Sequence, residues 1–347
     1  MLYLVRYDEL ALKSMRVRKV WESALARNIK EKIKNCKIRT ERGRIWVYAP
    51  QEAKYELAKI FGISSFSPCV QCDLENLERE VLEFAKRVLK EKKSFALRVS
   101  RVGSHDFTSI DIARELGEKI RREIPIKVDL TFPDEEIYIE IRNNRCYIFN
   151  EIIPGVGGLP FGVEGKVVSL LSGGIDSAVA TWMMMKRGCD PILLHLYINE
   201  HSLKNAKEIY EILREYSSTL EFMDIEHISF LEKIKGNKYT CILCKREMIR
   251  KAERVAEENR AKGIVTGDSL GQVASQTLDN LFVISQAATI PIYRPLIGLD
   301  KKEIIEIAKK IGVYGKVSKF ECEYAPKYPI TKARLEKVLE LERCIEK

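Results

Sequence analysis

The sequence predicts a mixed α/β protein, in which two small α+β domains precede a doubly wound α/β domain with a parallel sheet. After residue 166, short apolar runs alternate with helical stretches, which is typical of a parallel sheet covered by helices. Residues 153–162 are rich in proline and glycine and form the clearest boundary in the chain. The length of 347 residues is enough for two or three domains with ordinary cores.

The first domain, placed at residues 1–62, opens with an apolar run that is typical of a strand. In the helix that follows, apolar residues from Val17 to Ile33 recur at helical spacing, and lysine and arginine fill the other face. The expected order is strand, helix, strand, strand, helix: 2–7, 15–34, 37–40, 44–48 and a short helix ending at 61. This order is typical of a ferredoxin-like fold.

The second domain, placed at residues 63–152, mixes helices and strands in another order. Arg98 and Arg101 lie at the end of one of its strands, ahead of a loop. Its expected elements are helix 74–90, strand 94–100, helix 109–122 and strands 127–131, 136–141 and 145–149.

A linker at 153–165 leads to the third domain, placed at residues 166–347. Its buried strands are expected where short apolar runs occur, at 167–171, 191–196, 220–225 and 263–265. The last helix is expected at 332–342.

Charge and composition restrict the partners and the location. The net charge of +9 is concentrated at the N-terminus, where the first 50 residues carry 13 Lys and Arg against 5 Asp and Glu. Such a segment favours a polyanionic partner, most simply nucleic acid, although a solvated lysine-rich helix would look the same. No apolar run approaches the ~18 residues of a membrane span, and we expect neither a signal peptide nor a membrane partner. Nine dispersed cysteines favour a reducing cytoplasm.

The strongest motif is Ser172-Gly-Gly-Ile-Asp-Ser177, between an expected strand and an expected helix. Gly173 and Gly174 allow the backbone amides to converge, and the helix N-terminus adds positive dipole, so the turn can hold phosphate. Ser172 and Ser177 can donate hydroxyl hydrogen bonds, and Asp176 can position a metal ion or the backbone. The turn lacks the Gly-Lys-Ser/Thr of a Walker A loop and the G-x-G-x-x-G of a dinucleotide fingerprint.

This hexapeptide resembles the PP-loop signature of ATP pyrophosphatases, which implies attack on the α-phosphate and release of pyrophosphate. Further segments resemble one PP-loop family, the tRNA 4-thiouridine synthetases: 157–160 (GGLP), 165–166 (GK), 244–250 (CKREMIR), 266–277 (TGDSLGQVASQT), 293–301 (YRPLIGLDK) and 329–332 (PITK). The resemblance covers essentially the whole chain and implies that the second domain is a THUMP domain, which carries Arg98, Arg101 and the segment 128–130.

The resemblance implies roles for individual residues. An ATP pocket at the carboxyl ends of the strands, where open α/β sheets bind ligands, would include Leu170, Leu171, His195, Leu196, Lys245, Gly267 and Gln276. Without the resemblance, His195 would be read as a packing residue, Gly267 as a turn and Gln276 as a solvated side chain. Arg294 and Lys301 are candidates for contacting RNA or the departing pyrophosphate, with ordinary ion pairing as the alternative.

Sulfur chemistry is suggested by Cys241 and Cys244, which open a helix just before Lys245. Positions i and i+3 point the same way there, and the helix dipole is expected to lower the thiol pKa. Cys322 lies close to where the family carries its catalytic cysteine. Two mechanisms remain open: persulfide and disulfide exchange, or an iron–sulfur cluster ligated by all three thiolates. Cys69 and Cys72 should point to opposite faces of an extended stretch, and we read them as structural. The remaining cysteines stand alone and are read as packing or surface residues: Cys36, Cys146, Cys189 and Cys344.

The sequence thus predicts an ATP- and Mg²⁺-dependent enzyme that adenylates a uridine of tRNA, at position 8 by resemblance, and replaces O4 with sulfur. We expect an external sulfur donor, sulfide or a persulfide-carrying protein, because the family's rhodanese domain does not follow Cys322. A homodimer and a link to thiamine synthesis rest on the resemblance alone. The alternatives are another PP-loop thiolase or amidating ligase, or a THUMP RNA-binding protein or methyltransferase; the last would need a Gly-rich methyl-donor motif where Ser172–Ser177 stands.

Overall fold

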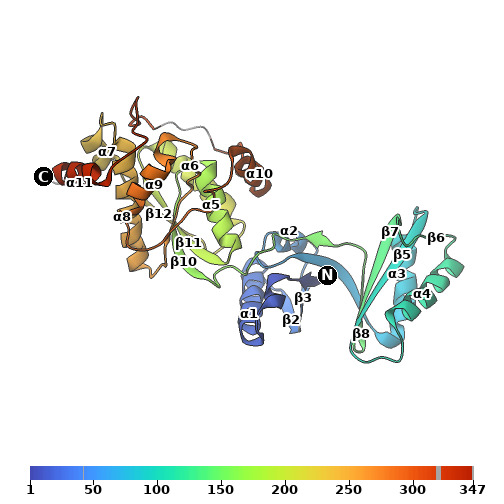
Figure 1. Ribbon diagram of the computed structural model, residues 1–347. Coiled ribbons are helices and arrows are strands. Elements are labelled where there is room, and N and C mark those ends of the chain that lie inside the picture. The colour runs from blue at the N-terminus through green and yellow to red at the C-terminus, as the bar shows by residue number, and fades with distance from the viewer. Residues whose placement is uncertain (42, 318–321, 346–347) are drawn as a thin grey trace. The chain divides into compact units, whose positions relative to one another are not determined.

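The computed structural model describes residues 1–41, 43–317 and 322–345 (Figure 1). Arg42, part of the expected turn before the third strand, lies outside the described residues. The chain divides into two compact units. Unit 1 comprises Met1–Leu12, Ile33–Ala58 and Ile63–Val156, and unit 2 comprises Lys13–Lys32, Lys59–Gly62 and Gly157–Lys347.

Unit 1 is built on a nine-stranded sheet with the strand order β2-β3-β1-β4-β8-β7-β5-β6, to which β9 adds by pairing with β4. Its strands are β1 (Leu2–Arg6), β2 (Lys37–Glu41), β3 (Arg44–Tyr48), β4 (Ser65–Asp73), β5 (Ser94–Val102), β6 (Lys127–Val128), β7 (Glu135–Arg142), β8 (Arg145–Phe149) and β9 (Ile153–Pro154). Its α-helices are α2 (Ala53–Leu57), α3 (Leu77–Val88) and α4 (Ser109–Glu123).

Strand β4 joins the two halves of this sheet. Its first half pairs with β1, from Ser65 opposite Arg6 to Cys69 opposite Leu2, and its second half pairs with β8. The sequence indicated only an extended stretch here, because Pro68 and two serines give no clear strand signal. Cys69 is buried in the cluster around Trp46, whereas Cys72 packs with the core between α3, α4 and the sheet. Their structural reading agrees with this packing.

Two expectations for unit 1 need correction. The strand expected at 127–131 stops at Val128, because the Asp129 carboxylate accepts hydrogen bonds from the backbone amides of Thr131 and Phe132 and turns the chain. Cys146, read as a solitary packing residue, lies directly opposite Cys72 across the β4–β8 pair.

Unit 2 contains the predicted parallel sheet, with the order β12-β11-β10-β13-β14 and neighbouring strands parallel throughout. Its strands are β10 (Gly165–Leu170), β11 (Cys189–Tyr197), β12 (Glu221–Glu226), β13 (Ile264–Val265) and β14 (Ile292–Tyr293). Its α-helices are α1 (Met15–Lys32), α5 (Ile175–Lys186), α6 (Glu200–Arg214), α7 (Ile228–Ile234), α8 (Thr240–Glu258), α9 (Leu278–Ser285), α10 (Lys301–Ile311) and α11 (Leu335–Ile345).

Helices cover both faces of this sheet, as the alternation in the sequence predicted. On one face, Ile249 and Ala252 of α8 share a buried cluster with Val168 of β10. On the other face, the hydroxyl of Ser169 lies 2.7 Å from that of Thr181 on α5, because successive side chains of a strand point to opposite sides. Figure 1 shows α5 and α8 on opposite sides of the strands.

Helix α11 is fixed to α8 by a buried ion pair. The Arg246 guanidinium donates to both carboxylate oxygens of Glu342, at 2.7 and 3.0 Å, and also to the Val283 carbonyl. Such a two-pronged pair has a defined geometry, so it orients the last helix as well as holding it.

Helix α1 is only partly packed. Ala24, Leu25 and Ile29 are buried as its apolar spacing predicted, but Val17 and Val20 near its start are exposed. The apolar stripe is therefore buried in its second half alone. Within the described part of the chain, no helix combines the length and the apolar character that crossing a membrane requires.

Candidate active site

The turn of Ser172–Ser177, predicted to bind phosphate, lies between β10 and α5, at the carboxyl end of the sheet. Gly173 has φ +81°, which favours glycine, and a Cβ there would lie 3.1 Å from Cβ of Asn205, so the space is also tight. The Ser177 hydroxyl accepts from the Ser172 amide at 3.1 Å and donates to the Gly174 carbonyl at 3.0 Å. These bonds brace the turn as a rigid cradle.

The start of α5 is suited to an anion. Gly174 is its N-cap, and among the described residues no side chain caps the first turn. Its amides and the positive end of the helix dipole thus remain for phosphate oxygens.

Asp176 is held from two directions. Its Oδ1 accepts from the Lys301 ammonium at 2.6 Å, at the start of α10, and its Oδ2 accepts from Gln272 Nε2 at 2.8 Å. The structure therefore brings Lys301, which the sequence offered as a contact for RNA or pyrophosphate, directly to the turn. A cation beside the phosphate cradle can stabilise negative charge on a departing pyrophosphate.

A cavity of about 220 Å³ opens next to the turn. Seven residues predicted from the sequence line it: Leu170, Ser172, Asp176, Ser177, Lys245, Gly267 and Gln276. Met248, Ile249 and Ile284 supply apolar surface, which suits a nucleotide base. Glycine is needed at position 267 for the cavity wall to pack against the turn, because a Cβ there would lie 2.7 Å from the Ser177 amide nitrogen.

Asp268, which sequence reasoning did not single out, organises the cavity wall. Its carboxylate accepts from Lys245 Nζ at 2.8 Å, from the Thr266 hydroxyl at 2.8 Å and from Gln276 Nε2 at 3.3 Å. Arg294, which is not among the described residues that line the cavity, also approaches this carboxylate, with Nε 3.4 Å from Oδ2. An acidic residue three positions after a buried strand was the available signal.

The charge state of Asp268 follows from these contacts. Burial opposes ionisation, but Lys245, Thr266 and Arg294 outweigh it and lower the pKa of Asp268 to about 2. The buried carboxylate is therefore ionised and keeps the two cations in place.

We expect Asp268→Asn to destabilise the protein in a pH-dependent way. Because the folded pKa is below the unfolded value, ionised Asp268 contributes stability above about pH 4, and this is lost as the pH falls toward 2. The variant should be less stable by about 2 kcal/mol at pH 7, with the gap closing at low pH. Urea unfolding at pH 7 and at low pH measures this. A gap of equal size at both would contradict the assignment; exposed Asp279→Asn is the matched control.

His195 braces the turn from behind. It is buried, its Nδ1 lies 2.6 Å from the Leu171 carbonyl, and its Nε2 lies 3.3 Å from the Ser202 hydroxyl. Burial lowers its pKa, so the ring is neutral and Nδ1–H donates to that carbonyl. Among the described residues, neither His195 nor Leu171, Gly173, Gly174 and Leu196 lines the cavity, and a contact of His195 or Leu196 with adenine stays a prediction.

The three cysteines lie near the start of α8. Cys241 and Cys244 are on its first turn, and Cys244 Sγ lies 3.4 Å from His227 Nε2. The expectation of a lowered thiol pKa is wrong here. Burial, and next the nearby Cys322, raise the pKa of both thiols, that of Cys244 to about 12.

Cys322 is exposed and follows residues outside the described ranges. Within the described ranges, no group of three Cys, His, Asp or Glu side chains is arranged to hold a metal ion. In this arrangement the three thiols therefore do not form the iron–sulfur site that one of the two mechanisms requires.

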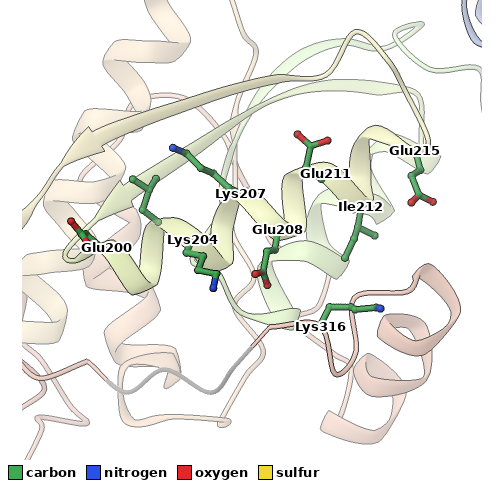
Figure 2. Close-up of a pocket in the computed structure, with 9 residues that line it drawn as sticks. Glu200, Lys204, Lys207, Glu208, Glu211, Ile212, Glu215 and Lys316 are labelled. Atoms are coloured by element: carbon green, nitrogen blue, oxygen red, sulfur yellow. The ribbon is translucent and has the colours of Figure 1, made fainter.

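A larger cavity of about 860 Å³ runs along α6 (Figure 2). Figure 2 shows carboxylates of Glu208, Glu211 and Glu215 interspersed with the amines of Lys204 and Lys207, while Lys316 approaches from the segment after α10. Because carboxylates and amines alternate, this cavity has no positive potential that would attract a triphosphate. No residue of the Ser172–Ser177 turn lines it. We therefore place the active site in the smaller cavity.

Comparison with known proteins agrees with this geometry. The family described as "Thiamine biosynthesis protein (ThiI)" matches residues 162–346, its ferredoxin-like domain matches 2–67, and the THUMP domain matches 72–151. A "Probable tRNA sulfurtransferase" from Methanocaldococcus jannaschii is 42% identical, over 99% of this chain and 97% of the relative. The chain belongs to the ThiI family.

Other ThiI-family members are similar over the same extent. A "Probable tRNA sulfurtransferase" from Thermococcus kodakarensis is 39% identical, over 99% of this chain and 96% of the relative. A solved 4-thiouridine synthetase, in complex with RNA and bound ATP, is 34% identical with a TM-score of 0.91, over 99% of this chain and 94% of that one. The predicted fold class of ferredoxin-like, THUMP and parallel-sheet domains is confirmed. The boundaries after residues 62, 152 and 165 stay predictions.

Proposed function

We propose that this ThiI-family chain is an ATP-dependent tRNA sulfurtransferase, which adenylates a uridine and replaces its O4 with sulfur to give 4-thiouridine. The observation that carries the proposal is the braced turn of Ser172–Ser177 beside the cavity, with Asp176 and Lys301 at its edge. The similar 4-thiouridine synthetase is described with RNA and ATP bound, and the relatives are named tRNA sulfurtransferases.

The chemistry assigns a purpose to each group. The C4 carbonyl of uridine is a poor electrophile, and adenylation converts its oxygen into a leaving group that a sulfur nucleophile can displace. The turn binds the phosphates, and Lys301 stabilises the charge that develops on pyrophosphate. The Asp176 carboxylate would offer oxygen ligands to Mg²⁺, which would neutralise the triphosphate when bound.

The sulfur would arrive at Cys241, Cys244 and Cys322. Persulfide exchange and cluster ligation remain two hypotheses for these thiols, and the described arrangement fits the cluster less well. We further propose an external sulfur donor, a homodimer and a cytoplasmic location; these rest on the family resemblance and on cysteine usage.

Nucleoside analysis of tRNA tests the function directly. Bulk tRNA from cells that lack the gene should contain no 4-thiouridine, and expression of the wild-type chain should restore it at position 8. Restoration by a chain that carries Asp176→Ala, or unchanged 4-thiouridine in the deletion strain, would count against the proposal.

Helix α1 supplies a separate prediction about RNA binding. Deleting the first 50 residues is not an informative test, because β1 lies inside the sheet between β3 and β4. Alanine substitution of the basic residues Arg16, Lys19 and Lys30 should keep the fold, because all three are exposed. We expect weaker tRNA binding and a shallower log–log salt dependence, by about 0.7–0.9 for each phosphate group that is no longer neutralised.

Titration of tRNA binding at several salt concentrations measures this slope. The matched control replaces three exposed lysines of α6 and α10, namely Lys204, Lys207 and Lys310. An unchanged slope in the α1 variant, or an equal change in the control, would show that α1 is only a solvated face.

A further inference from the structure

His227 is a buried histidine that contacts one of the three cysteines assigned to sulfur chemistry. It lies between β12 and α7 and is 1% exposed. Its ring approaches two residues of α8: Nε2 is 3.4 Å from Cys244 Sγ, and Nδ1 is 3.2 Å from Lys251 Nζ. Cys244 and Lys251 are two helical turns apart, so the ring bridges them along one side of the helix.

The partners of His227 fix the position of its ring proton. The Lys251 ammonium can only donate, and it donates to the Glu226 carbonyl at 2.8 Å and to Nδ1 of His227. Nδ1 is therefore an acceptor, the proton is on Nε2, and Nε2–H donates to the Cys244 sulfur. Phe230 stacks on the ring, with centroids 5.5 Å apart and planes inclined by 27°, and helps to hold it in place.

The sulfur of Cys244 lies against the wall of the nucleotide cavity. The Cys244 thiol is 3.9 Å from Met248 Sδ, and Met248 lines that cavity, as does Lys245. Cys244 is partly exposed, which sulfur exchange requires. His227 is not among the described residues that line the cavity. It can therefore act on the sulfur of Cys244 without touching the nucleotide.

Sulfur chemistry places negative charge on the cysteine sulfur. The thiolate is the nucleophile in thiol exchange and also the form that binds iron. A charged group that is largely buried is costly unless donors are directed at it. His227 supplies such a donor to Cys244, and Lys251 on the other side of the ring adds a positive charge.

We propose that His227 is a positioning residue for sulfur transfer, which holds the negatively charged sulfur of Cys244 through the hydrogen bond from Nε2–H. This inference rests on the proposed function. It applies to persulfide exchange and to cluster ligation, because both use Cys244 as a thiolate. A charged sulfur is a stronger acceptor than a thiol, so the bond strengthens during sulfur transfer and has no part in adenylation.

The position of the ring proton can be measured in the wild-type protein without an assay of activity. NMR with isotope-labelled histidine distinguishes protonated from unprotonated ring nitrogens, and the chain has four histidines. The signals of His227 are those absent from His227→Phe or His227→Gln. They should show a proton on Nε2 alone, whereas His195, whose Nδ1 donates to a carbonyl, should show the reverse. A proton on Nδ1 of His227 overturns the proposal.

Single-turnover kinetics test the role in sulfur transfer. His227→Phe keeps a ring against Phe230 but removes the donor, so formation of 4-thiouridine should slow by at least about 10-fold. Pyrophosphate release and KM for ATP should stay within about twofold of wild type. His227→Gln retains an N–H donor and should recover part of the rate. His201→Phe, at an exposed histidine of α6, is the matched control.

The role of His227 is overturned if His227→Phe thiolates tRNA at the rate of His201→Phe. It is also overturned if pyrophosphate release falls as much as thiolation, or if His227→Gln is as slow as His227→Phe, because altered packing against α8 would then explain the loss. Wild type that forms no 4-thiouridine contradicts the proposed function instead, and the NMR measurement still decides the hydrogen bond.

Discussion

Asp176→Ala should abolish tRNA-dependent pyrophosphate release, with a loss of at least about 1,000-fold, and leave tRNA affinity nearly unchanged. The carboxylate organises three parts of the site, because it contacts Lys301 and Gln272 and lies on the first turn of α5. Removing it leaves the cation without a partner at the phosphate turn and removes an oxygen that suits Mg²⁺. Groups that act together at a reacting phosphate each cost several kcal/mol when removed.

Pyrophosphate release in a single turnover, together with tRNA binding by filter retention, separates these effects. Asp279→Ala is the matched control, since Asp279 is an exposed acid on the first turn of α9. Residual activity above a tenth of wild type would remove Asp176 from the adenylation step. Equal loss of tRNA binding would instead point to damage of the fold.

The parts of the site that were predictable are those carried by a local motif. Strand β10, the turn at Ser172–Ser177 and helix α5 are contiguous, so hydrophobic spacing and two glycines were sufficient to predict them. Helix α8 begins at Thr240, next to Cys241, where the sequence predicted a helix to open. Lys245 lines the cavity, and its contact with ATP stays a prediction.

The parts that were missed depend on contacts between distant segments. Asp268 is significant only because Lys245 and Arg294 converge on it, and no sequence window contains all three. The expected thiol pKa was wrong because the helix dipole was visible in the sequence, whereas the burial of Cys244 was not. The exposure of Val17 and Val20 likewise could not be predicted from helical spacing. The spacing shows which residues share a face of the helix, but not whether another element packs on that face.

The second large effect concerns the cysteines. Alanine at Cys241, Cys244 or Cys322 should reduce thiolation of tRNA by at least about 1,000-fold, while pyrophosphate release persists. The two steps separate because the turn and Asp176 stay intact, and because none of the three thiols lines the nucleotide cavity among the described residues. Cys344→Ala, an exposed cysteine on α11, is the matched control.

Iron binding then distinguishes the two mechanisms for these thiols. After anaerobic reconstitution with iron and sulfide, the cluster hypothesis expects iron in wild type, read by absorbance and Mössbauer spectroscopy, and none in the Cys241/Cys244/Cys322→Ala triple variant. Cys322 already lies close enough to raise the pKa of both Cys241 and Cys244, although no three-donor group is found among the described residues. If wild type thiolates tRNA and binds no more iron than the triple variant, the cluster hypothesis is wrong and persulfide exchange remains. If single cysteine variants thiolate at the rate of Cys344→Ala, the thiols have no part in sulfur transfer under either mechanism.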